Sequence, residues 1–144
     1  MLKALSLVGY LAMVGGVVGL LAMRKLFSHS WVIIVLQGAA LLLFTWARLT
    51  LGRRSFHLAA NPTEGGIITS GPYRRLRHPI YAAMCLFAAA GAAGHWSWSS
   101  GLCVGLILAG AMVRIFCEET LVTARYLEYS AYAAKTWRLL PFVF

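Results

Sequence analysis

The chain has 144 residues, of which 60% are hydrophobic, and it carries a formal net charge of +9. This length suits one domain, and so large an apolar share argues against an ordinary soluble protein. The basic residues stand beside apolar runs and form no recognisable nucleic-acid module, so we expect no nucleic-acid partner. The three cysteines are scattered without a Cys-x-x-Cys pair, and we therefore expect no disulfide and no metal site.

Four apolar segments are long enough, or nearly long enough, to cross a bilayer as helices. They are residues 5–23, 31–51, 80–94 and 99–116. A spanning helix needs roughly 20 apolar residues, because each residue rises about 1.5 Å across a core of about 30 Å. The third segment is therefore short, and it must be extended or tilted. Arg24 and Lys25 follow the first segment where a cleaved signal would have small residues, so we expect a retained span.

Two of these segments carry glycines four residues apart, Gly15 with Gly19 and Gly101 with Gly105. Small residues at this spacing let helices approach closely in lipid, so we expect them to form packing faces. Gln37 lies within the second segment, where a polar side chain indicates a hydrogen bond to another helix.

The basic residues also predict the orientation in the membrane. If the N-terminus is cytoplasmic, the loop before the third segment and the C-terminal tail are cytoplasmic as well. The cations on that side are then Arg53, Arg54, Arg74, Arg75, Arg77, Arg125, Lys135 and Arg138, against Arg24 and Lys25 on the other. The positive-inside rule thus predicts a multi-pass protein whose N-terminus, arginine-rich loop and C-terminus are cytoplasmic.

A basic tract between Pro72 and Pro79 leads into the third segment. Pro79 suits the first turn of a helix, because its missing N–H would have no partner there. His78 is therefore predicted at the start of that helix, whose N-terminal N–H groups and partial positive charge suit an anionic group.

After the fourth segment, residues 118–140 resemble an amphipathic helix. Tyrosines recur every third residue on one face, with Glu128 beside them and Lys135 continuing the stripe. These tyrosines are Tyr126, Tyr129 and Tyr132. The sequence therefore predicts an all-α integral membrane protein with about four transmembrane helices and a C-terminal amphipathic helix.

Ionisable and aromatic residues gather around the start of the third segment and just after the fourth. Such groups at membrane depth cost about 3 kcal/mol each on insertion scales and by default indicate a function. The alternative is an interfacial belt, in which arginines bind lipid phosphates, tyrosines anchor the helices and glutamates pair with arginines. The residues are Tyr73, Arg77, His78 and Tyr81 around the start of the third segment and Glu118 and Glu119 after the fourth.

These residues occur within or beside three sequence motifs. They are Ile68-Thr69-Ser70-Gly71-Pro72-Tyr73-Arg74 with Arg77-His78-Pro79-Ile80-Tyr81, then Glu118-Glu119-Thr120-Leu121, then Glu128-Tyr129-x-x-Tyr132-x-x-Lys135-x-x-Arg138-Leu139-Leu140-Pro141. In this order around one helical hairpin, they resemble the signature of the isoprenylcysteine carboxyl methyltransferase family, to which the phospholipid N-methyltransferases are related. The chain departs from the family pattern at Ala83, at Leu127 and at Lys135, where the family usually has Gly, a Phe-Gly pair and Arg.

The resemblance implies one membrane methyltransferase domain over residues 1–144. Two N-terminal spans lie in residues 1–51, a cytoplasmic loop in 52–78, and a catalytic helical hairpin with the C-terminal segment in 79–144. It also implies S-adenosylmethionine as cofactor and S-adenosylhomocysteine as product, bound between the last two spans and the C-terminal segment. The implied cofactor-binding residues are Tyr73, Arg77, His78, Tyr81, Glu118 and Glu119, and the implied catalytic residues are Glu128, Lys135 and Arg138.

The chemistry leaves the acceptor open. A carboxylate acceptor needs no general base, whereas an amine needs one, for which Glu128 or Glu119 is the candidate. Lys135 and Arg138 suit an anionic acceptor or head group, or are interfacial cations. We expect membrane lipids as partners and a lipophilic acceptor (a small molecule, a lipid or a prenylated chain end), methylated as in carboxyl O-methylation. The alternatives are phospholipid head-group N-methylation and a non-catalytic lipid-binding subunit.

Overall fold

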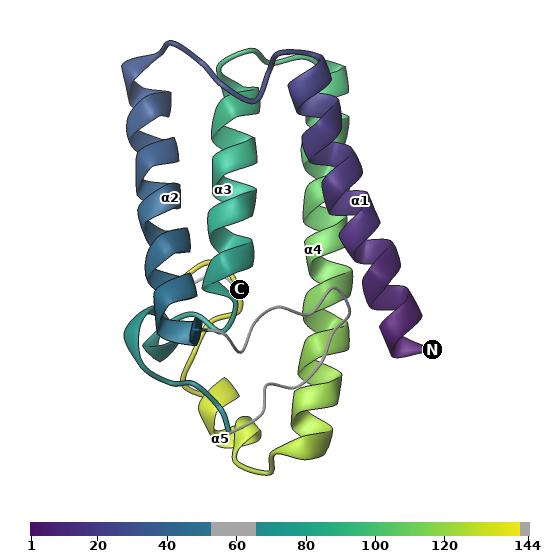
Figure 1. Ribbon diagram of the computed structural model, residues 1–144, viewed down its shortest axis with the longest axis vertical. Helices are drawn as coiled ribbons and strands as arrows, with labels where there is room; N and C mark the ends of the chain where they lie inside the picture. Colours follow the sequence, from purple (N-terminus) through teal and green to yellow (C-terminus); the bar gives the residue numbers. More distant parts are fainter. Residues whose placement is uncertain (53–65, 142–144) are drawn as a thin grey trace.

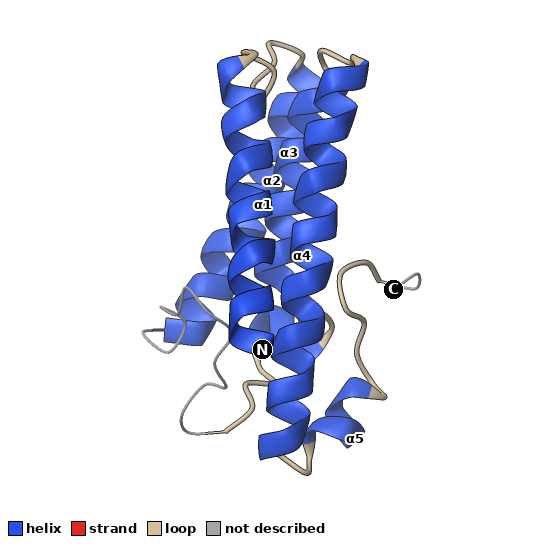
Figure 2. Ribbon diagram, turned by 90° about the vertical axis from the view of Figure 1, so that its right-hand side faces the viewer, coloured by secondary structure: helices blue, strands red, loops and turns tan. Residues whose placement is uncertain are grey.

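The computed structural model describes residues 1–52 and 66–141, and in that part of the chain every regular element is a helix (Figures 1 and 2). The elements are α1 (Leu2–Ala22), α2 (Trp31–Leu51), the 3-10 turn η2 (Gly71–Arg74), α3 (Pro79–Ala93), α4 (Trp98–Arg125) and α5 (Tyr129–Ala133). α1, α2 and α4 are long and apolar enough to cross a membrane, and α3 is a shorter apolar helix. The predicted helical membrane protein is confirmed, while Arg53 and Arg54 of the predicted loop lie outside the described residues.

The four bundle helices, α1 to α4, run alternately up and down. α1 packs along α4, α2 packs along α3, and α3 joins the two pairs by packing against α4. The N-terminus, the end of α2, the start of α3 and the end of α4 consequently lie at one end of the bundle (Figure 1). These are the segments for which the basic residues predict a common, cytoplasmic side.

Glycines bring α1 and α4 together, at positions that differ in part from the predicted ones. A Cβ atom on Gly9 would lie 2.8 Å from the carbonyl oxygen of Gly110, and one on Gly16 would lie 2.7 Å from the carbonyl oxygen of Cys103. By contrast, a Cβ atom on Gly105 would meet no atom within 4 Å. The predicted pair in α4 is therefore wrong as a packing face, because Gly105 points away from α1.

The predicted hydrogen bond of Gln37 is confirmed at the opposite end of the bundle from α5. Its amide nitrogen donates to the carbonyl oxygen of Leu26 at 2.7 Å and to that of Phe87 in α3 at 3.2 Å. The side chain is buried, so this polar group is satisfied within the bundle and fastens α2 to α3 and to the connection that precedes α2.

The C-terminal segment corrects the prediction of one amphipathic helix over residues 118–140. α4 continues to Arg125 and ends at Tyr126, whose φ of −124° and ψ of 107° are extended. α5 then covers only Tyr129–Ala133. After α5 the chain pairs with the residues before α3: the N–H of Arg77 donates to the carbonyl of Trp137 at 2.7 Å.

The reason for the break is tertiary. In one continuous helix, Glu119 and Arg138 would lie about 28 Å apart along the axis. In the structure the Arg138 Nε lies 3.0 Å from a carboxylate oxygen of Glu119. A buried carboxylate needs such partners, so the ion pair and the backbone pairing favour a folded-back segment over a longer helix.

Candidate active site

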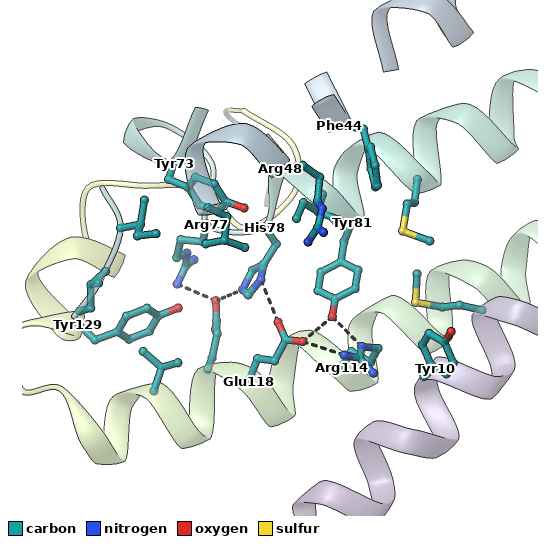
Figure 3. A pocket seen from close by; sticks show the side chains of 18 of the residues that line it. Tyr10, Phe44, Arg48, Tyr73, Arg77, His78, Tyr81, Arg114, Glu118 and Tyr129 are labelled. Atoms are coloured by element: carbon teal, nitrogen blue, oxygen red, sulfur yellow. Dashed lines mark hydrogen bonds and ion pairs between the residues drawn. The ribbon is translucent and has the colours of Figure 1, made fainter. Parts of the chain in front are cut away.

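Two neighbouring carboxylates of α4 and one imidazole form the centre of the site (Figure 3). His78 is the residue before α3, as predicted from Pro79, and its side chain does not cap that helix. The imidazole Nε2 instead lies 3.2 Å from Glu119 Oε1, and the Nδ1 lies 3.7 Å from Glu118 Oε2. His78 therefore stands between Glu118 and Glu119 and connects the start of α3 to α4.

Glu119 joins three parts of the chain. Its Oε1 lies 3.2 Å from Arg77 Nη1, in the segment before α3, and its Oε2 accepts a hydrogen bond of 3.0 Å from Arg138 Nε, in the C-terminal segment. The Glu119 side chain is only 11% exposed, so these cations replace the water that an ionised carboxylate requires. Glu119 therefore has a positioning role that sequence reasoning did not distinguish from that of Glu118.

Glu118 belongs to a second network, centred on Arg114. The Tyr81 hydroxyl donates to Glu118 Oε1, and Arg114 Nη2 lies 3.3 Å from the same oxygen. Arg114 Nε also donates to the Tyr81 hydroxyl oxygen at 2.6 Å. From α1, the carbonyl of Ser6 accepts from Arg114 Nη1 at 3.4 Å, and the guanidinium lies 5.5 Å from the ring centroid of Tyr10. Arg114 thus connects α1, α3 and α4 at the site.

The motif search missed Arg114. The signal was present in the sequence, because a cation inside an apolar segment is costly and requires partners. Its side chain is 7% exposed, which is consistent with the partners described above.

Most residues of the two networks around Glu118 and Glu119 line one cavity of about 690 Å³. Its ionic end comprises Arg77, His78, Tyr81, Arg114, Glu118 and Glu119, together with Tyr73, Tyr126, Tyr129 and Tyr132. Its apolar part comprises Met13, Val14, Val17 and Val18 of α1, Phe44 of α2, and Ile80 and Met84 of α3. All six predicted cofactor-binding residues therefore face one space.

The predicted catalytic residues lie elsewhere. Glu128 and Lys135 are exposed and do not line the cavity. Arg138 does not line it either, but it holds Glu119. Among the described residues, the carboxylates that a ligand in the cavity can reach are thus Glu118 and Glu119. Among the positions that depart from the family pattern, neither Ala83 nor Leu127 lines the cavity.

Three tyrosines outside the spans, Tyr73, Tyr129 and Tyr132, stay neutral at physiological pH. Burial raises the pKa of Tyr73 and of Tyr129, and for Tyr129 the nearby Glu119 raises it further. Burial also raises the pKa of Tyr132 to about 12, and its hydroxyl donates to the carbonyl oxygen of Tyr73 at 2.7 Å. These side chains therefore offer aromatic faces and hydrogen-bond donors without adding charge.

A comparison with protein families agrees with this arrangement. Residues 30–128 match the family model described as phospholipid methyltransferase. The chain belongs to the phospholipid methyltransferase family. That family is related to the isoprenylcysteine carboxyl methyltransferases, so the resemblance seen in the sequence motifs is confirmed. No curated protein and no solved structure matches this chain.

The match covers α2, α3 and α4, and with them most of the residues at the ionic end of the cavity. Together with the three helices that can cross a membrane, it identifies the chain as a membrane methyltransferase. α1 and the segment from Tyr129 onward lie outside the matched residues, although both contribute side chains to the cavity of this methyltransferase.

Proposed function

We propose that this membrane methyltransferase uses S-adenosylmethionine and methylates a lipophilic acceptor on the cytoplasmic side of the membrane. The observation that carries the proposal is one cavity with two chemically different parts, an ionic end between α3, α4 and the C-terminal segment and an apolar part beside α1 and α2. A charged cofactor suits the first part and a lipid chain suits the second.

The residues of the ionic end fit the charged groups of the cofactor. Arg77 Nε is buried and meets no hydrogen-bond partner among the described residues, so it suits a carboxylate oxygen of the methionyl part. Glu118 and Glu119 can accept from the ammonium group and the ribose hydroxyls. The rings of Tyr73 and Tyr129 suit the adenine.

The bound cofactor supplies a methyl group on a sulfonium sulfur, and the bond electrons return to that sulfur when the acceptor takes the methyl. The chain's own part is to hold the acceptor in line and to exclude water. An amine acceptor must also lose a proton. Glu118 is the carboxylate best placed to receive this proton. Tyr81 and Arg114 both engage its Oε1, whereas its Oε2 lies 3.7 Å from His78 Nδ1.

Two acceptors fit this chemistry. The motif order resembles isoprenylcysteine carboxyl O-methyltransferase, for which the acceptor is a carboxylate on a prenylated chain end. The second is the head-group amine of a phospholipid, the class of substrate that the description of the matched family names. The cavity argues against a non-catalytic subunit. Ala83 and Leu127, where the chain departs from the family pattern, do not line it.

The first experiment measures S-adenosylhomocysteine binding to the purified protein in detergent by calorimetry. We expect saturable binding that Glu118→Gln and His78→Ala weaken at least about tenfold, since each removes a polar partner from the ionic end. Glu128→Gln is the matched control, because it changes an exposed carboxylate outside the cavity in the same way. Unchanged binding in both cavity variants would reject the assignment of the site. Folded wild-type protein that does not bind would reject the cofactor.

The acceptor is then identified with radiolabelled S-adenosylmethionine and two substrates, phosphatidylethanolamine and a farnesylated cysteine. Label that survives mild base in a lipid product indicates N-methylation, and label released by base as methanol indicates a carboxyl ester. Neither product, from protein that binds the cofactor, would reject both acceptors.

A further inference from the structure

Arg48 is a cavity residue that neither the sequence motifs nor the cofactor assignment uses. It lies in the last turn of α2, on the face that also carries Phe44 one turn earlier and Leu51 one turn later, and all three line the cavity. Figure 3 shows its side chain entering from α2, across the cavity from Glu118 and Arg114 of α4. Arg48 is therefore placed on the wall that a ligand in the apolar part would follow toward the ionic end.

The charges of the cavity favour an anionic ligand. Among the described residues that line it, three are arginines and two are carboxylates: Arg48, Arg77, Arg114, Glu118 and Glu119. Both carboxylates already have a guanidinium partner, Glu118 in Arg114 of α4 and Glu119 in Arg77 of the segment before α3. The described lining therefore carries a net positive charge, to which Arg48 adds from the side of α2, and this charge favours a second anion, distinct from the one that Arg77 suits.

The surroundings of Arg48 indicate where that anion comes from. Phe44 stands one turn before it in α2, and Val14 and Val18 of α1 line the same cavity while remaining 40% and 56% exposed. α1 and α2 are the outer helices of the bundle and do not pack along each other as α1 does with α4 (Figure 1). A lipid chain between these apolar residues would bring its head group to Arg48.

We propose that Arg48 binds an oxyanion in the head group of the acceptor and thereby selects acceptors that carry one beside the methyl-accepting atom. The proposal rests on the proposed function. A phosphodiester is separated from the amine of an ethanolamine lipid by two carbons, so an anion held at Arg48 leaves the amine free to reach the ionic end. The guanidinium suits this role because its fork of N–H donors matches a phosphate or a carboxylate.

The test compares Arg48→Gln and Arg48→Lys with Arg74→Gln, an arginine of η2 that is exposed and outside the cavity. Charge-assisted hydrogen bonds to an oxyanion correspond to a change of about 10- to 100-fold in affinity. We expect Arg48→Gln to raise the KM for the anionic acceptor by that factor with little change in kcat. Arg48→Lys should fall between, because lysine keeps the charge and loses the bidentate geometry. Arg74→Gln should match wild type.

Measurements with different acceptor substrates show whether Arg48 binds a phosphodiester or a carboxylate. A raised KM for phosphatidylethanolamine, with an unchanged KM for an N-alkyl ethanolamine that has no phosphate, assigns the phosphodiester. A raised KM for a farnesylated cysteine assigns the carboxylate. An unchanged KM for every anionic acceptor in both variants would refute the role of Arg48.

Binding of S-adenosylhomocysteine separates this inference from the proposed function. We expect its Kd to be the same in wild type and Arg48→Gln. A weakened Kd with an unchanged acceptor KM would assign Arg48 to the cofactor and overturn the inference. Failure of wild type to bind would overturn the proposed function instead. If Arg48→Gln does not fold, Arg48→Lys carries the same comparison.

Discussion

Replacing Arg114 by methionine should destabilise the protein, because Glu118 would lose its only close guanidinium among the described residues. Arg114 Nη2 and Glu118 Oε1 are 3.3 Å apart, and the two side chains are 7% and 24% exposed. At an effective dielectric constant of about 20, two charges at this distance attract each other by about 5 kcal/mol. Desolvation of the guanidinium offsets much of this, and Glu118 keeps Tyr81 and His78. We therefore expect Arg114→Met to lower the free energy of unfolding by about 3 kcal/mol.

A double-mutant cycle with Glu118→Gln isolates the pair. The unfolding free energies of wild type, both single variants and the double variant are measured in mixed detergent micelles by titration with a denaturing detergent. The double variant should be about 2 kcal/mol more stable than the sum of the single effects predicts, because it no longer leaves a charge without its partner. Arg125→Met is the control, since this exposed arginine ends the same helix and should change stability by less than about 0.5 kcal/mol. Additive effects within about 0.5 kcal/mol would refute the ion pair as a source of stability.

Three further variants probe other contacts. Gly9→Ala should destabilise the protein by roughly 1–3 kcal/mol and lower the midpoint of thermal unfolding, because its Cβ atom would lie 2.8 Å from a main-chain oxygen of α4. Gly105→Ala should leave the midpoint unchanged, because its Cβ atom would meet no atom within 4 Å. Equal shifts of the midpoint in both variants would contradict the packing of α1 on α4. Tyr132→Phe should lose about 1 kcal/mol below pH 10. Burial raises the pKa of Tyr132 to about 12, so the stability that its neutral hydroxyl contributes is lost as the pH rises from 10 through 12. A difference in unfolding free energy between wild type and Tyr132→Phe that stays constant up to pH 12 would argue against this burial. Glu119→Gln should loosen the C-terminal segment and speed its cleavage by trypsin, and an unchanged cleavage rate would show that its ion pairs do not hold that segment.

Features that depend on local chemistry could be predicted from the sequence. The second span was predicted over residues 31–51, and α2 covers Trp31–Leu51, because an apolar run bounded by polar residues leaves the backbone few alternatives in lipid. Pro79 placed His78 at the start of α3 for an equally local reason, the missing N–H of proline. The six residues predicted to bind the cofactor converge on one cavity, because they stand at helix ends that the topology brings together.

The errors arise where distant parts of the chain decide. Spacing alone does not tell which face of α4 meets α1: the predicted pair includes Gly105, which meets no atom within 4 Å, whereas Gly110, outside the pair, makes the close contact. The tyrosine pattern after α4 resembles a helix, but the ion pair between Arg138 and Glu119 folds the chain back. Arg114 was overlooked because a hydropathy window averages over a single charge. The partners that such a charge requires within an apolar helix are what indicate its place in the site.

The backbone pairing between the C-terminal segment and the residues before α3 has a consequence for biosynthesis. The main-chain N–H of His78 donates to the carbonyl of Arg138 at 3.1 Å, and that of Arg77 donates to the carbonyl of Trp137. The donors are translated before α3, and the acceptors are translated only after α4 is complete. A nascent chain can therefore insert all four long helices while its ionic site is still unfinished. The contacts of Arg138 and Trp137 that complete the site form only when the final segment has been translated and has returned to the bundle.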